Sequence, residues 1–373
     1  MKVATILGTR PEIIRLSRVI AALDRYVEHV LVHTGQNYDH ELSQIFFEDL
    51  ELRPPDMYLQ AAGATAAETI GNVIALADTA LRRIEPDAVL ILGDTNSCLA
   101  AIAAKRLRIP VFHMEAGNRC FDERVPEEIN RRIVDHIADI NMPYSDISRG
   151  YLLAEGLPAD RVIKTGSPMY EVLDYYRPRV DASGILTTLN LEPNAFFVVS
   201  VHREENVDDE RQFESLVALL EKLVSEYSLP VVFSAHPRTR ARLKESGASL
   251  PPEVLTLKPF CLSDYVRLQL AARAVLSDSG TISEEASILN LRALNIRQAH
   301  ERPEAMEETS VMMTGFSWPR VAEALCILEA QPRGEDRLLQ MVADYQAPHV
   351  SEKVVRLIIS YTDYVRRAVW RAV

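Results

Sequence analysis

Two short segments in the first half of the chain place a carboxylate after an apolar run, and a third places carboxylates at the start of the next predicted helix. Asp94 stands in GDTNS and Glu115 in HMEAGNR, while VPEEINRR contains Glu127, Glu128 and Arg131. If the apolar runs are neighbouring parallel strands, these acids share one sheet edge, where crowded carboxylates raise one another's pKa toward the range that general acid–base catalysis needs. Each acid alone has an ordinary interpretation, as a helix cap or a solvated loop residue. Together they favour catalysis, although a magnesium site stays open because carboxylates also bind magnesium.

The turn after the first apolar run has the residue types of a phosphate site. In GTRPE, residues 8–12, a glycine permits a tight turn and Pro11 suits the first position of a helix. The free amides and partial positive charge of that helix N-terminus would lie beside Arg10. An ordinary strand–helix turn with a surface arginine explains the motif equally well, so GTRPE alone decides nothing.

A second turn, SDSGTISEE at residues 277–285, is a stronger candidate for binding phosphate. Ser279, Gly280 and Thr281 can cradle a pyrophosphate with backbone amides and hydroxyls, and a glutamate one turn into the helix can accept hydrogen bonds from ribose hydroxyls. The alternative is a helix cap formed by Ser279 or Thr281. Because a cap does not require glycine at position 280, the motif favours a ligand.

Two histidines also follow apolar runs in the second half of the chain. His202 and Arg203 stand in SVHREEN, residues 200–206, and are expected to project beyond the end of a strand. A lone histidine is more often structural, but this position favours function. His236, in SAHPR after the next apolar run, receives a weaker form of the same argument.

The elements that position these residues alternate between short apolar runs, which predict buried parallel strands, and longer amphipathic stretches, which predict helices. In the first half the predicted strands are residues 2–7, 30–34, 88–92, 110–114 and 139–142, with a candidate at 162–164, and the predicted helices are residues 11–23, 41–50, 66–83, 97–107 and 127–138. In the second half the predicted strands are residues 196–201, 231–234, 254–257, 274–277, 293–296 and 310–313, and the predicted helices are residues 211–227, 239–246, 262–272, 282–289 and 319–329.

This alternation predicts an α/β fold with two Rossmann-like, doubly wound domains facing a central cleft. Residues 1–175 would form the domain with the acids, and residues 190–350 a second domain. The polar segment 176–192 is the predicted linker. An amphipathic helix at 351–373 is expected to cross back to the first domain.

Composition narrows the functional classes. A chain of 373 residues is long enough for two domains, and its net charge of −12 argues against nucleic-acid binding. No apolar run approaches a membrane span, and MKVATILGTRPE lacks the features of a signal peptide. The four cysteines form no CxxC pair, which predicts neither a zinc site nor a disulfide framework. We therefore expect a cytoplasmic protein that does not interact with membranes.

Seven segments in order resemble the non-hydrolysing UDP-N-acetylglucosamine 2-epimerase family: GTRPE, GDTNS, MEAGNR, PEEINR, VHREEN, SDSGTISEEA and ERPEA. The resemblance covers nearly the whole chain. It implies the two-domain architecture of many nucleotide-sugar glycosyltransferases (GT-B-like), a homodimer, a UDP-sugar substrate and no cofactor or metal. It also implies a reaction in which UDP is eliminated across C1–C2 of the sugar, and the resulting glycal takes UDP back with a proton on the opposite face of C2.

The resemblance also implies roles for single residues. Arg10, Ser279, Gly280 and Thr281 would hold phosphates and Glu285 the ribose. The catalytic set would be Asp94, Glu115, Glu127, Arg131 and His202, and further residues predicted around the substrate are Arg15, Arg203, Asn206, His236, Phe260 and Arg302. Which acid serves which face of C2 is not decided by the sequence.

Several positions depart from the common family pattern. Arg15 stands where lysine is usual, and Thr281 replaces a second glycine. The segments HTGQNYDHE, residues 33–41, and LNIRQAHERP, residues 294–303, also differ. These departures resemble the subgroup that converts UDP-2-acetamido-2,6-dideoxy-L-talose to UDP-N-acetyl-L-fucosamine for surface polysaccharides such as O-antigen or capsule. A UDP-N-acetylglucosamine 2-epimerase and a GT-B-type glycosyltransferase are the alternatives.

Overall fold

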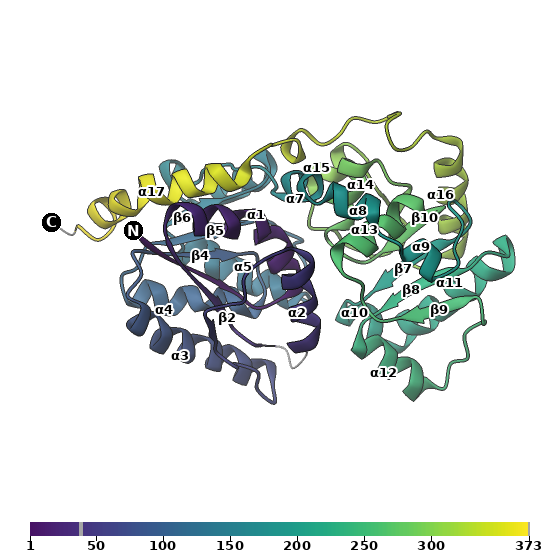
Figure 1. The fold of residues 1–373 in the computed structure, drawn as a ribbon, viewed down its shortest axis with the longest axis horizontal. Helices are drawn as coiled ribbons and strands as arrows, with labels where there is room; N and C mark the ends of the chain where they lie inside the picture. Colours follow the sequence, from purple (N-terminus) through teal and green to yellow (C-terminus); the bar gives the residue numbers. More distant parts are fainter. Residues whose placement is uncertain (37–39, 372–373) are drawn as a thin grey trace. The chain divides into compact units, whose positions relative to one another are not determined.

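The computed structural model describes residues 1–36 and 40–371, which form two compact units (Figure 1). Unit 1 comprises Met1–Tyr175 and Asp344–Val373, and unit 2 comprises Tyr176–Ala343. Each unit is built on its own six-stranded parallel sheet. The two sheets with their flanking helices confirm the predicted doubly wound α/β class.

The sheet of unit 1 has the strand order β3-β2-β1-β4-β5-β6. Its strands are β1 (Lys2–Leu7), β2 (Glu28–His33), β3 (Met57–Tyr58), β4 (Ala88–Leu92), β5 (Val111–Met114) and β6 (Ile140–Met142). β1 pairs with β4, and β4 with β5, all in parallel. The chain order therefore reverses between β1 and β4, and the carboxyl ends of strands at such a switch point are the usual place for a ligand.

Helices cover both faces of this sheet. They are α1 (Arg10–Tyr26), α2 (His40–Asp49), α3 (Ala66–Ile84), η1 (Asn96–Leu99), α4 (Ala100–Arg106), α5 (Pro126–Ile137), α6 (Asp146–Ala154), η2 (Ala159–Arg161), α7 (Met169–Tyr175) and α17 (Val350–Ala368), with η3 (Ala343–Tyr345) at the boundary of the two units. The C-terminal helix α17, drawn in yellow in Figure 1, packs along α1. Ser351 at its start donates through its backbone nitrogen to Glu171 at 2.9 Å, which ties α17 to α7.

The sheet of unit 2 has the order β12-β11-β10-β7-β8-β9. Its strands are β7 (Phe197–Val201), β8 (Val231–Ala235), β9 (Val254–Leu257), β10 (Ala274–Ser277), β11 (Ala293–Asn295) and β12 (Met312–Met313). The helices of the unit are α8 (Arg177–Ala182), α9 (Ile185–Thr188), α10 (Glu204–Val207), α11 (Glu210–Tyr227), α12 (Pro237–Ser246), α13 (Leu262–Ala271), α14 (Ile282–Leu289), α15 (Pro303–Glu307) and α16 (Trp318–Ala330). Here the order reverses between β7 and β10, which pair in parallel.

The structure corrects some of the predicted elements. Residues 176–192 are not a linker: they form α8 and α9 and belong to unit 2. Ile185, Leu186 and buried Leu191 pack on an apolar core of unit 2. The polar composition of the segment as a whole gave no indication of these apolar contacts. The candidate strand at 162–164 makes only one isolated bridge, between Val162 and Asn141. No helix among the described residues is long and apolar enough to cross a membrane.

Candidate functional site

The predicted acids lie at the carboxyl edge of the unit 1 sheet. Asp94 follows β4, Glu115 directly follows β5, and Glu127 lies in the first turn of α5. Arg131, also on α5 and buried, contacts Asp94: its Nη2 lies 2.7 Å from Asp94 Oδ2. The β4 turn and α5 are therefore joined by an ion pair that orients the Asp94 carboxylate.

Glu115 is held by a residue from a different element. Arg15 Nη1, on α1, lies 2.6 Å from Glu115 Oε2, and each side chain is 7% exposed. Asn118 Nδ2 donates to Glu115 Oε1 at 3.3 Å. Glu115 also has a φ of +64°, a backbone conformation that is uncommon for residues other than glycine and costs of order 1–3 kcal/mol. The structure thus places Arg15, predicted around the substrate, directly against a predicted catalytic acid.

The neighbouring glutamate of PEEINR has a different environment. Glu128 is buried, and its carboxylate contacts Arg131 at 3.0 Å and Arg132 at 3.1 Å. Burial raises the pKa of Glu128, but hydrogen bonds from Cys120 and the charge of Arg131 outweigh it and hold that pKa below its usual value. Sequence reasoning grouped Glu128 with Glu127 in VPEEINRR but gave it no role of its own.

An acid that sequence reasoning missed, Glu12, organises the GTRPE turn. Glu12, almost fully buried on α1, accepts hydrogen bonds from Gly8 N at 3.0 Å and Thr9 Oγ1 at 2.7 Å. It also accepts from Thr95 Oγ1 at 3.3 Å and from Ser97 Oγ. Burial raises the pKa of Glu12, against the lowering effect of these hydrogen bonds. Glu12 therefore links the turn that contains Arg10 to the turn that follows Asp94 in the chain.

A buried polar network lies behind the Glu115 turn. His113 Nδ1 lies 3.0 Å from Asp135 Oδ1, and its Nε2 contacts Gly93 O at 2.8 Å. Asp135 also pairs with Arg119 at 2.7 Å and accepts from Gly117 N at 3.2 Å. Burial lowers the pKa of His113, but the hydrogen bond and charge of Asp135 outweigh it and raise that pKa. The network holds the β4 and β5 turns against α5.

In unit 2, one buried aspartate joins two of the predicted motifs. Asp278 accepts from the backbone nitrogens of His202 at 3.1 Å and Arg203 at 3.0 Å, and from Asn206 Nδ2 at 3.0 Å. Its Oδ1 lies 2.9 Å from His202 Nδ1, so the other ring nitrogen of His202 is directed away from Asp278. Burial raises the pKa of Asp278, but the charge and hydrogen bonds of His202 and the bond from Asn206 lower it to about 2. The sequence showed this aspartate within SDSG without indicating its role.

The SDSGT turn lies directly beside these residues. Ser279 Oγ and Thr281 Oγ1 are 2.9 Å apart, and Thr281, at the start of α14, makes no side-chain cap bond. A Cβ added at Gly280 would lie 3.8 Å from both Arg203 Nη2 and Glu301 Oε2, an ordinary contact distance. The packing of the protein therefore does not require glycine at 280. Ser279 Oγ accepts from the backbone nitrogen of Thr281 at 3.3 Å, so the structure favours Ser279 over Thr281 as the capping side chain.

The remaining predicted residues of unit 2 differ in their surroundings. Glu285 accepts a hydrogen bond from Gln269 at 2.6 Å, and Arg302 lies 3.6 Å from Glu284. Phe260 is partly buried and packs on the apolar core. His236 is exposed and caps α12, where its Nδ1 accepts from a backbone nitrogen. The structure thus gives His236 a local capping role.

The described residues contain no group of three or more His, Cys, Asp or Glu side chains that could hold a metal ion. The carboxylates of Asp94 and Glu115 instead contact arginines. That arrangement gives no support to the magnesium alternative.

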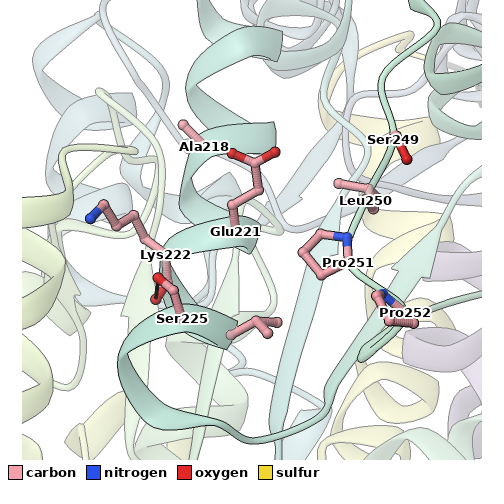
Figure 2. Close-up of a pocket in the computed structure, with 9 residues that line it drawn as sticks. Ala218, Glu221, Lys222, Ser225, Ser249, Leu250, Pro251 and Pro252 are labelled. Carbon is pink, nitrogen blue, oxygen red and sulfur yellow. Dashed lines mark hydrogen bonds between the residues drawn. The ribbon is translucent and has the colours of Figure 1, made fainter.

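A surface pocket in unit 2 lies elsewhere (Figure 2). Glu221 and Lys222 line it from the second half of α11, and Leu250 and Pro251 line it from the chain that leads into β9. In a parallel sheet these segments approach the amino ends of the strands. The pocket is therefore on the opposite side from the SDSGT turn, which follows the carboxyl end of β10.

Comparisons with known proteins define the class. A family model described as UDP-N-acetylglucosamine 2-epimerase matches residues 21–359. The UDP-N-acetylglucosamine 2-epimerase structure from Rickettsia bellii is 49% identical, covers 99% of each chain and has a TM-score of 0.91. The UDP-GlcNAc 2-epimerase structure from Methanocaldococcus jannaschii, in complex with UDP-GlcNAc and UDP, is 30% identical over 96% of this chain and 100% of that chain, with a TM-score of 0.90. The UDP-2,3-diacetamido-2,3-dideoxy-D-glucuronate 2-epimerase of Pseudomonas aeruginosa is 32% identical over 87% of this chain and 91% of its own.

These relatives are isomerases, and the two solved ones share the fold over nearly the whole chain. The chain belongs to the UDP-N-acetylglucosamine 2-epimerase family. The predicted family and the predicted enzyme class are therefore confirmed, and the family supports epimerisation at C2 of a UDP-sugar.

Proposed function

We propose that the protein inverts C2 of a UDP-2-acetamido sugar by eliminating UDP and adding it back to a glycal. The observation that carries the proposal is the group of acids after β4 and β5 and at the start of α5 in unit 1. Asp94 and Glu115 are each oriented by a buried arginine, at 2.7 and 2.6 Å. Oriented carboxylates on one sheet edge are suited to moving a proton to and from carbon.

The chemistry explains why more than one acid is needed. The C2 hydrogen beside an acetamido group is not acidic enough for simple deprotonation, so its removal is coupled to departure of UDP from C1. One base takes the proton, and an acid on the other face returns one to the glycal. Asp94, Glu115 and Glu127 are the proposed groups, with Arg131, which contacts Asp94, as the proposed catalytic cation in unit 1. Water must be kept from the intermediate, and the glycal must stay bound, because either reaction with water or escape of the glycal would waste substrate.

We propose that unit 2 binds the UDP moiety at the carboxyl ends of β7 and β10. The Ser279-Gly280-Thr281 turn and Arg203 would hold the pyrophosphate, and Glu285 would accept from the ribose hydroxyls. His202 and Asn206, both tied to Asp278, would line the same site. The M. jannaschii relative was solved with UDP-GlcNAc and UDP, which supports a UDP-sugar ligand.

For the sugar itself, we propose UDP-2-acetamido-2,6-dideoxy-L-talose, converted to UDP-N-acetyl-L-fucosamine. Support comes from Arg15, which contacts Glu115, from Thr281, and from the unusual segment 294–303. The other unusual segment, 33–41, includes residues 37–39, which lie outside the described residues. The P. aeruginosa relative is named for a sugar other than N-acetylglucosamine, so family members differ in substrate. UDP-N-acetylglucosamine is the second candidate because several relatives are named for it.

The test is to incubate single UDP-sugars with the enzyme in deuterated water, without an acceptor, and to follow the H2 signal by NMR. The proposal expects exchange of H2 and an equilibrium mixture of two C2 epimers. Absence of exchange with every UDP-acetamido sugar contradicts epimerisation and favours a glycosyltransferase, whereas accumulation of free sugar and UDP indicates a hydrolysing enzyme. The ratio of kcat/KM for the 6-deoxy-L-talo sugar and UDP-N-acetylglucosamine decides the substrate.

The homodimer and a place in O-antigen or capsule precursor synthesis stay predictions from the resemblance, and the cytoplasmic location stays a prediction from the sequence. Light scattering coupled to gel filtration tests the dimer directly. A mass close to that of one 41.9 kDa chain at micromolar concentration contradicts it.

A further inference from the structure

A buried glutamine lies beside the glutamate that is proposed to bind the ribose. Gln269 is on α13, where Leu268 and Ala271 pack into the apolar core. Gln269 is 2% exposed and Glu285 is 6% exposed. An amide in such surroundings is unfavourable unless it is hydrogen-bonded, so the contacts of Gln269 indicate why it is there.

The nitrogen of that amide is committed to Glu285. Gln269 Nε2 donates to Glu285 Oε2 at 2.6 Å. An ionised carboxylate can only accept, so the amide nitrogen, not its oxygen, must face Glu285, and the orientation of the amide follows. Hydrogen bonds to a charged group are shorter and stronger than those between neutral groups. The bond therefore restricts the position of the Glu285 carboxylate in the first turn of α14.

The oxygen of the same amide accepts no hydrogen bond from the described residues. Gln269 Oε1 is buried and has no hydrogen-bond partner among the described residues. A leucine or methionine would fill similar volume on α13 without desolvating an amide oxygen, so packing alone does not explain glutamine at this position. What the glutamine adds is its bond to Glu285.

We propose that Gln269 is a positioning residue for nucleotide recognition, which aligns Glu285 to accept hydrogen bonds from the ribose hydroxyls of a uridine diphosphate. A neutral amide suits this purpose because it orients the carboxylate without cancelling its charge, as an arginine or lysine would. The inference rests on the proposed function, in which unit 2 binds the UDP moiety through Glu285.

The test compares two nucleotides that differ only in the groups that Glu285 would bind. Isothermal titration calorimetry gives Kd for UDP and for 2′,3′-dideoxyuridine diphosphate with the wild-type enzyme, the Gln269→Leu variant and the Gln269→Met variant. We expect both substitutions to weaken UDP binding about five- to tenfold, which is about 1–1.4 kcal/mol of binding free energy. Binding of the dideoxy nucleotide should weaken less than about twofold. In a Glu285→Gln background, Gln269→Leu should have no further effect on UDP.

The matched control is Gln331→Leu, which removes a half-buried glutamine at the end of α16 and should leave both affinities unchanged. Equal loss for both nucleotides, or unchanged UDP binding, overturns the inference. Thermal unfolding checks each variant; if Gln269→Leu does not fold, Gln269→Met decides. A wild-type enzyme that does not bind UDP overturns the proposed function and this inference with it. If the wild-type enzyme binds UDP but the Gln269 substitutions change the affinities for UDP and for the dideoxy nucleotide equally, the inference is overturned and the proposed function stands.

Discussion

The buried pair of Arg15 and Glu115 provides a quantitative test of how the acids in unit 1 are held. Their charged groups are 2.6 Å apart, and each side chain is 7% exposed. Removing one partner of a buried ion pair costs about 3–5 kcal/mol, because the other charge is left poorly solvated. Asn118 still donates to Glu115 at 3.3 Å, and neither group is wholly buried. We therefore expect Arg15→Met to lower the free energy of unfolding by about 3 kcal/mol.

Urea unfolding followed by circular dichroism measures this loss. Arg15→Lys keeps the charge but not the guanidinium geometry and should cost about 1 kcal/mol. Combining Arg15→Met with Glu115→Gln removes the stranded charge and should recover most of the stability. Arg25→Met, at an exposed position on the same helix, is the control and should change stability by less than about 0.5 kcal/mol.

Two results would refute the reasoning. A cost below about 1 kcal/mol for Arg15→Met would mean that the pair behaves like an exposed salt bridge. Equal costs for Arg15→Met with and without Glu115→Gln would mean that the arginine stabilises α1 independently of the carboxylate.

Three further predictions concern single residues of the two units. Glu115→Gln should reduce H2 exchange, followed by NMR, by at least about 10²-fold while UDP affinity changes only a few-fold, and wild-type rates contradict its catalytic role. Gly280→Ala should leave the thermal midpoint nearly unchanged, since the added Cβ meets atoms only at 3.8 Å, yet weaken UDP binding measured by calorimetry by about tenfold or more; unchanged affinity argues against the phosphate turn. The pKa of Asp278 falls from 3.8 to about 2 on folding. Ionised Asp278 therefore adds about 2 kcal/mol to the free energy of unfolding above pH 4, and this contribution is lost as the pH falls toward 2. Asp278→Asn should flatten the fall of unfolding free energy over that range, and an unchanged slope in urea titrations contradicts the assignment.

The two sheets and most of their strands could be predicted from the sequence because strand and helix patterns are local. The errors came where tertiary packing outweighed composition. Residues 176–192 read as a polar linker, yet Ile185, Leu186 and Leu191 bury enough surface on the core of unit 2 to fold the segment into short helices. β3 was not predicted because its two residues, Met57 and Tyr58, are a strand only through pairing with β2.

The sequence by itself determined that acids would gather after neighbouring strands and that a Ser-Gly-Thr turn would begin a helix, since both follow from short motifs beside strand ends. Only the tertiary structure decided which side chains meet. Arg15 and Glu115 are 100 residues apart in the chain, and Asp278 reaches His202 across 76 residues. Such pairs depend on strand order, which places β1, β4 and β5 in succession in one sheet and β7 next to β10 in the other. A motif shows which residues follow a strand. The hydrogen bonds between strands determine which strands are adjacent, and therefore which charged side chains meet.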